Sequence, residues 1–150
     1  MFTTVKHSRS VIALVMAFTL IISPSVLAEQ KKTYGKHDVH YVASNTAMLT
    51  PTIAKAYNIQ RSKSRGIVTI AVRDTDKNSA SEALVRGSVK NPIGQLQALD
   101  FTKVVDQEAI YYLATFSFAD EQKMNFDVLI SPEGVAKSHV LQFEQQFFVE

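Results

Sequence analysis

The strongest constraint on the fold is a repeated alternation of apolar and polar residues. In the run KMNFDVLI, Met124, Phe126, Val128 and Ile130 stand two positions apart, with mostly polar residues between them. Successive side chains of a β-strand point to opposite faces, so this period of two predicts a half-buried strand. Such a strand must cover its apolar face with another layer of structure.

Six further runs resemble strands, and turn residues separate them at intervals of about ten residues. The last run is expected to point Leu141, Phe143, Phe147 and Val149 to the core, and Gly87 suggests a β-bulge in the third run. We predict an all-β, immunoglobulin-like antiparallel sandwich of about seven strands over residues 37–150. A jelly roll or a small barrel is the alternative. The seven runs are HDVHYVAS, GIVTIAVR, EALVRGSV, ALDFTKVV, AIYYLATFSF, KMNFDVLI and HVLQFEQQFFV.

The first 28 residues have the pattern of a secretory signal peptide. Lys6 and Arg9 precede the apolar run VIALVMAFTLII, and small or aliphatic residues occupy Val26 and Ala28. An apolar run of this length is too short to span a membrane as a helix, which takes roughly 17 residues or more. We therefore expect cleavage after Ala28, a flexible segment over residues 29–36, and no membrane insertion afterwards.

The charge and the cysteine content of the chain indicate in which compartment it works and which partners are excluded. Lys6 and Arg9 belong to the sixteen Lys and Arg residues, whereas all fourteen Asp and Glu residues follow Ala28. The exported chain thus has fourteen charges of each sign and no net charge, which argues against nucleic acid as a partner. It has no cysteine, and therefore no disulfide framework or thiol nucleophile. We expect a periplasmic protein.

One short helix is predicted between the first two strands of this scheme. Thr50 suits the N-cap, Pro51 suits the first helical position, and Asn58 suits a left-handed end. Only about two turns fit, and a helix of that length is not stable alone in water. Ile53 and Tyr57 are therefore expected to pack on the sandwich, where the helix would cover an open end of the core.

A run of cations follows the helix. Arg61, Lys63 and Arg65 are two apart, so an extended backbone would project them from one face. With Tyr57 they form a candidate binding surface for an unknown envelope protein or an anionic component. The alternative is a charged strand edge that prevents aggregation.

Four segments carry a resemblance to a known family: HDVHYVASNT, LTPTIAKAYNIQRSKSRG, AIYYLATFSF and the SPEG turn. With them the chain resembles a family of small exported proteins of Gram-negative bacteria, domain of unknown function 4426, from about His37 to the C-terminus. The resemblance implies an immunoglobulin-like sandwich and a periplasmic location. It implies no activity, substrate or catalytic residue.

The loop DTDKNSASE is a weak candidate for a calcium site. Asp74 and Asp76 occupy the first and third positions of an oxygen-ligand loop. The glycine and the final acid of that pattern are replaced by Ser79 and Val85, and strands flank the loop. These departures favour a hairpin loop with solvated acids over an ion site.

The histidines are weak candidates for zinc or copper. His37 and His40 are three apart, which on a strand sends them to opposite faces. They can share one metal only if the backbone bulges, and His139 is a candidate third ligand.

No catalytic motif is visible: the chain lacks GxSxG, SxxK and a glycine-rich phosphate loop. We therefore expect a binding or interaction module without enzymatic activity or cofactor. A small-ligand or metal-ion binding protein is the alternative.

Overall fold

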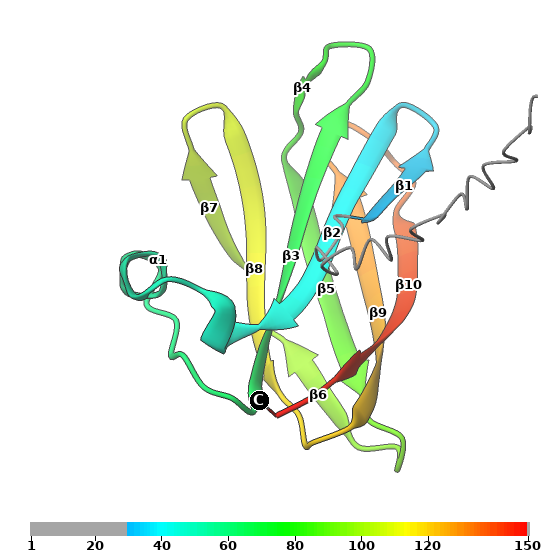
Figure 1. Ribbon diagram of the computed structural model, residues 1–150. Helices are drawn as coiled ribbons and strands as arrows, with labels where there is room; N and C mark the ends of the chain where they lie inside the picture. The colour runs from blue at the N-terminus through cyan, green and yellow to red at the C-terminus, as the bar shows by residue number, and fades with distance from the viewer. Residues whose placement is uncertain (1–29, 150) are drawn as a thin grey trace, which may run out of the picture.

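Two antiparallel sheets, stacked face to face, form the body of the computed structural model, which describes residues 30–149 (Figure 1). The expected signal peptide lies outside these residues. The six-stranded sheet has the order β1 (Gln30–Tyr34), β2 (His37–Asn45), β3 (Arg65–Asp74), β8 (Ala109–Ser117) and β7 (Thr102–Asp106), and β4 (Ser79–Ala80) also pairs with β3. The four-stranded sheet has the order β10 (His139–Phe147), β9 (Gln122–Pro132), β5 (Ala83–Lys90) and β6 (Leu96–Leu99).

Two short helical pieces, η1 (Thr46–Met48) and α1 (Pro51–Ala56), connect β2 to β3. The predicted all-β sandwich with one short helix is thus confirmed. Within residues 30–149, no helix has both the length and the apolar character needed to cross a membrane.

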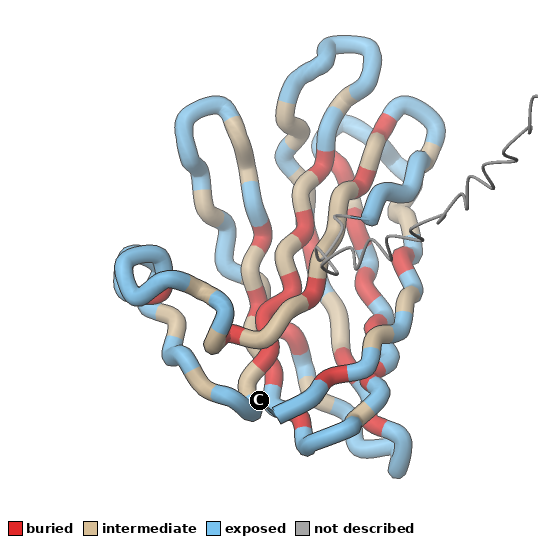
Figure 2. Tube along the Cα trace, viewed as in Figure 1, coloured by how far each residue is buried: buried red, intermediate tan, exposed pale blue. Residues whose placement is uncertain are grey.

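The core lies between the two sheets, and strand alternation supplies it from both sides. Val68, Ile70 and Val72 of β3 are 0% exposed, and their β9 counterparts Met124 and Ile130 are also 0% exposed. Figure 2 shows buried and more exposed residues in alternation along these strands. The inward positions predicted for the β9 run are therefore confirmed.

Aromatic rings join the two sheets at the centre of this core. Phe126 of β9 stacks on Phe143 of β10 with ring centroids 4.5 Å apart, and the edge of Phe116 from β8 meets it at 5.1 Å. Phe147 also meets Phe116, at 5.2 Å. Offset and edge-to-face pairs are the favoured aromatic arrangements, so these rings fix the sheets relative to each other.

Residues 30–149 form ten strands, whereas the sequence predicts about seven. The segment predicted to be flexible contains β1, which pairs with β2 along its whole length. The residues of β1 show no alternation of buried and exposed positions, since all but Tyr34 are exposed. Lys31 and Thr33 instead bind the carboxylate of Asp38 at 2.9 and 2.6 Å.

Three further details differ from the sequence prediction. The run ALDFTKVV is divided between β6 and β7, which belong to different sheets. Gly87 does not mark a bulge, because the pairing of β5 with β9 continues through it. Val149 is 39% exposed, since β10 ends at Phe147.

Gly66 has no room for a side chain. A Cβ atom there would lie 2.2 Å from Cζ of Phe116, whose ring covers this position of β3. The two residues are direct partners across the β3–β8 pairing. Gly66 therefore lets an aromatic ring of the core approach the backbone closely.

We expect Gly66→Ala to lower the free energy of unfolding by about 1–3 kcal/mol, because the new methyl group overpacks the core. Urea denaturation measures this change. In a Phe116→Leu background the same substitution should cost less, since the ring that it meets is gone. An equal cost in both backgrounds would contradict the proposed contact.

Candidate binding site

The connection between β2 and β3 has well-defined helical ends. The side chain of Thr50 accepts a hydrogen bond from the Ile53 N–H at 3.3 Å, and Pro51 is the first helical residue. Asn58 has a φ of 52°, and the Ile59 N–H binds the Ala54 carbonyl at 2.7 Å. The capping residues predicted for α1 are confirmed.

Hydrogen bonds at the base of this connection hold its two ends together. The hydroxyl of Thr46, which is 0% exposed, donates to the Ser62 carbonyl at 3.2 Å and accepts from the Ser62 N–H at 3.0 Å. The Asn45 amide donates to the Lys63 carbonyl at 2.9 Å, and the Arg61 guanidinium donates to the Ala47 carbonyl at 2.9 Å. We call residues 46–64, closed in this way, the clasp segment.

A small apolar pocket lies between the clasp segment and the outer face of the six-stranded sheet. Its volume is about 170 Å³. On the clasp side it is lined by Leu49, Ile53, Tyr57 and Ile59. The helix therefore does not cover an open end of the core, as the sequence suggested; it lies over the outer face of a sheet.

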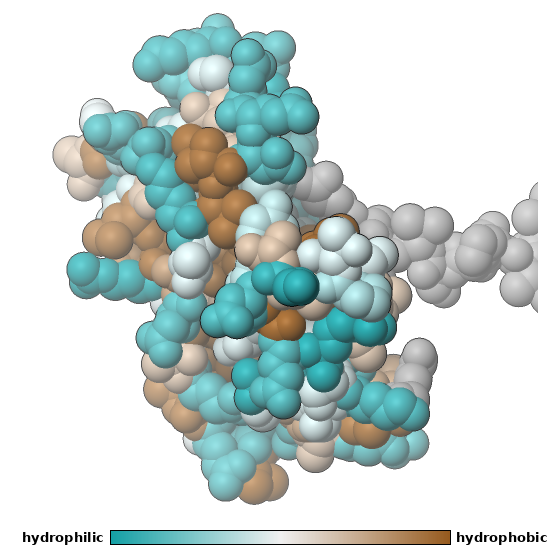
Figure 3. Space-filling model, turned by 90° about the vertical axis from the view of Figure 1, so that its left-hand side faces the viewer, coloured by the Kyte–Doolittle hydropathy of each residue, from teal (hydrophilic) through white to brown (hydrophobic). Residues whose placement is uncertain are grey.

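The sheet side of this pocket comes from three neighbouring strands. Ile67 and Thr69 of β3, Tyr111 and Leu113 of β8, and Val104 of β7 line it. Figure 3 views the side that carries α1 and β7, where hydrophobic side chains gather among hydrophilic ones. Apolar residues on both faces of β3 explain why its sequence is apolar almost throughout.

Access to the pocket is open, since several lining side chains reach the surface. Ile53 is 44% exposed, Tyr57 38% and Tyr111 36%. Tyr111 also borders a larger and more polar hollow of about 590 Å³, which includes His40 and Arg73. The outer face thus has an apolar site beside a polar one.

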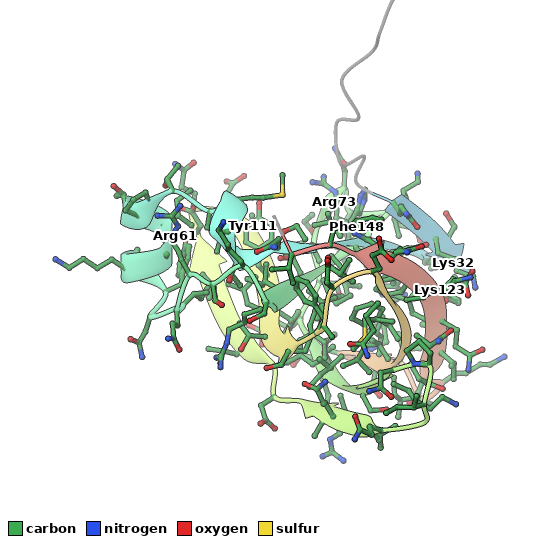
Figure 4. All side chains as sticks on the ribbon, turned by 60° about the horizontal axis from the view of Figure 1, so that its bottom comes forward. Lys32, Arg61, Arg73, Tyr111, Lys123 and Phe148 are labelled. Atoms are coloured by element: carbon green, nitrogen blue, oxygen red, sulfur yellow. The ribbon has the colours of Figure 1, made fainter. Side chains whose placement is uncertain are left out.

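The cations of the candidate surface do not lie along one extended strand. Arg61 and Lys63 are exposed in the clasp segment, the chain turns at Lys63 and Ser64, and only Arg65 belongs to β3. Figure 4 shows Arg61 and Tyr111 on the side of α1, and Lys32 and Lys123 on the far side. The structure places Tyr57 in the pocket wall, whereas Arg61 is not among the lining residues and donates to the Ala47 carbonyl.

The Asp74 carboxylate uses its oxygen atoms to stabilise a turn of the backbone. The Asp74 carboxylate accepts the N–H groups of Lys77 and Asp76 at 3.0 and 2.9 Å. These bonds, that from Lys77 first, hold the pKa of Asp74 below its ordinary value. Asp76 pairs with Lys36. The loop is a hairpin connection between β3 and β4.

The histidines divide between the two faces of the six-stranded sheet. His37 is 7% exposed and faces the core side, whereas His40 borders the polar hollow on the outer face. His139 approaches His37, with ring centroids 6.3 Å apart. Across residues 30–149, no group of three or more His, Cys, Asp or Glu residues can hold a metal ion.

The sequence indicated the helix and the cations but not the sheet half of the pocket. Tyr111 and Leu113 belong to a run that is apolar almost throughout, so alternation gave no signal for an outer apolar face. The separation of β6 from β7 was also missed, and with it the position of Val104.

The stability of the metal-free protein should fall as the pH decreases below about 6.5, the ordinary pKa of histidine. Burial, followed by the nearby His37 and Lys137, lowers the pKa of His139. The unfolded chain then binds a proton that the folded chain does not, so acid favours unfolding. His139→Phe keeps a ring against Tyr34 and removes this group. Urea denaturation between pH 7 and 5 should show a smaller loss for the variant; equal slopes would contradict the assignment.

A family model described as a domain of unknown function, DUF4426, matches residues 31–150. The crystal structure of a DUF4426 family protein from Pseudomonas aeruginosa PAO1 is similar with a TM-score of 0.72 and 30% identity, over 81% of this chain and 96% of that chain. No curated protein matches.

Two more distant structures share the fold. FetP of a uropathogenic Escherichia coli strain, expressed recombinantly in the periplasm, has a TM-score of 0.55 and 13% identity over 81% of this chain and 94% of its own. A copper-bound FetP variant has a TM-score of 0.55 and 12% identity, with coverage of 82% and 92%. At such identities the likeness concerns the fold alone. The family match and the Pseudomonas structure together show that the chain belongs to the DUF4426 family.

Proposed function

We propose that this chain is a non-catalytic binding module of the bacterial cell envelope. It takes one bulky apolar side chain of a partner protein into the pocket beneath α1, and acidic residues beside that side chain meet the cations of the clasp segment. The observation that carries the proposal is the open apolar pocket between the clasp segment and the six-stranded sheet.

The size of the pocket favours a single side chain over a small metabolite. A cavity of about 150 Å³ lined by apolar residues binds benzene, whereas sites for drug-sized ligands measure roughly 300–1,000 Å³. At about 170 Å³ the pocket accommodates one aromatic ring or one branched aliphatic group. Protein interfaces are commonly anchored by such a side chain in a pocket.

Charge around the pocket favours an acidic partner. The chain has no Asp or Glu between Asp38 and Asp74, whereas the clasp segment within this stretch includes Lys55, Arg61 and Lys63. The clasp segment is therefore locally positive, although the exported chain is neutral. Complementary charge speeds encounter and selects among partners. Nucleic acid fits less well, because the positive charge is confined to this segment.

Envelope location and lack of catalysis are also part of the proposal. The leader pattern in residues 1–28 and the absence of cysteine support export to the periplasm. The side chains that line the pocket are mostly apolar, and the hydroxyl groups of Tyr57, Thr69 and Tyr111 have no His, Asp, Glu or Lys among the other lining residues to act as a base. A binding role uses this pocket as it stands.

Phenylbutyrate, which joins a benzene ring to a carboxylate, should bind the pocket and shift the NMR methyl signals of Ile67 and Leu113. Butyrate, which lacks the ring, should not. Thr69→Phe places a ring in the pocket on a strand that favours aromatic residues, so it should weaken phenylbutyrate binding at least tenfold, or about 1.4 kcal/mol. Asn125→Phe, on the four-stranded sheet, is the matched control. Equal binding to both variants would overturn the pocket assignment.

A photoreactive amino acid at position 57 should crosslink a partner in living cells, because Tyr57 lines the pocket. The same group at position 123, on the far side of the molecule, should not yield that product (Figure 4). Thr69→Phe should abolish the product, and Lys63→Ala with Arg65→Ala should reduce it. Identical products from positions 57 and 123 would argue against a pocket-centred interface.

A further inference from the structure

Two histidines from different sheets meet at one end of the sandwich. His37 begins β2 of the six-stranded sheet, and His139 begins β10 of the four-stranded sheet. Their ring centroids are 6.3 Å apart, with the ring planes inclined at 44°. This pair is separate from the apolar pocket and takes no part in the proposed partner binding.

Packing holds both rings in place, and a hydrogen bond fixes the tyrosine that stacks on one of them. His37 is 7% exposed. The ring of Tyr34 stacks on His139 with centroids 4.7 Å apart, and the Tyr34 hydroxyl donates to the Val140 carbonyl at 2.8 Å. A pair of nitrogen donors fixed in this way loses little freedom when it binds a ligand.

One nitrogen of the pair lacks a hydrogen-bond partner. Among the described residues, Nε2 of His139 is a buried side-chain polar atom with no protein donor or acceptor in reach. Buried polar atoms are nearly always paired, so such an atom calls for an explanation. A neutral imidazole nitrogen serves either as a hydrogen-bonding group or as a metal ligand.

We propose that His37 and His139 bind one monovalent copper ion, Cu(I), through one imidazole nitrogen of each ring. Two metal–nitrogen bonds of about 2.0 Å in a line, extended by the distance from each nitrogen to its ring centre, separate the centroids by roughly 6 Å. The observed centroid distance of 6.3 Å fits this arrangement.

The number of donors selects the ion. Structural zinc takes four ligands, and among the described residues no group of three or more His, Cys, Asp or Glu side chains could hold one metal ion together. Cu(I) accepts two ligands in a line, and imidazole suits copper. Asp74, the partner of His37 in the β2–β3 pairing, supplies negative charge, whereas Lys137 near His139 opposes it.

Solvent reaches the pair from the side of His37. A hollow of about 520 Å³ is bordered by His37, Asp74, Glu82 and Glu133, together with Lys36 and Lys77. Its carboxylates attract a cation toward His37. The ion thus has a route to the histidines without opening the sandwich.

Silver(I), a redox-inert substitute for Cu(I), tests the site by NMR of the untagged protein. One equivalent should shift the imidazole nitrogen signals of His37 and His139 and leave those of His40 in place. This measurement needs no variant. Shifts at His40, or no shift at either member of the pair, would overturn the proposal.

Anaerobic titration with Cu(I) against a competing chelator provides the second test. Wild type and His40→Phe should bind one equivalent, whereas His37→Phe and His139→Phe should each bind at least tenfold more weakly, a change in affinity of one decade. Met48→Leu controls for an exposed thioether, since Met48 is 65% exposed. Circular dichroism checks that each variant folds. Retained affinity in a folded His139→Phe variant would refute the site.

Discussion

The structure depends on the burial of apolar side chains on both faces of one strand. The inner residues of β3 are fully buried against the four-stranded sheet, and Ile67 on its outer face is only 4% exposed. An antiparallel sheet commonly leaves one face to water. Here the outer face around β3 is apolar, so it needs a cover, and the clasp segment supplies one. The cover is incomplete, and the remaining space is the proposed binding pocket.

Period-two alternation was sufficient to predict the strands that bury one face. The β9 run and the caps of α1 were read correctly because burial and capping leave local patterns in the sequence. Strand β1 was missed because an exposed edge strand with Lys31 and Lys32 has no burial pattern, and such charges are typical of protected edges. The division of ALDFTKVV between two sheets depends on contacts far along the chain.

Local sequence patterns also failed to predict the parts of the candidate sites that come from distant strands. The sequence identified Tyr57 and the cations, which are neighbours in the chain, but not Leu113 or Val104 across the pocket. It placed His37 and His40 on opposite faces from their spacing alone. His37 and His139 begin two strands that belong to different sheets, so no local sequence pattern predicts that they lie close together. Sites assembled from distant strands become visible only once the sheet order is known.

The hydrogen bonds that close the clasp segment allow its sequence to vary. Asn45, Thr46 and Arg61 all bind main-chain atoms on the opposite limb, at Lys63, Ser62 and Ala47. Every amino acid presents the same carbonyl group, so these attachments tolerate replacement of the residues that supply the carbonyls. The residues of the clasp segment between these hydrogen bonds can therefore be replaced while its ends stay joined in the same way. Substitutions in the clasp segment can therefore change the partner specificity of the pocket, in related proteins or in engineered variants, while the two sheets keep their structure.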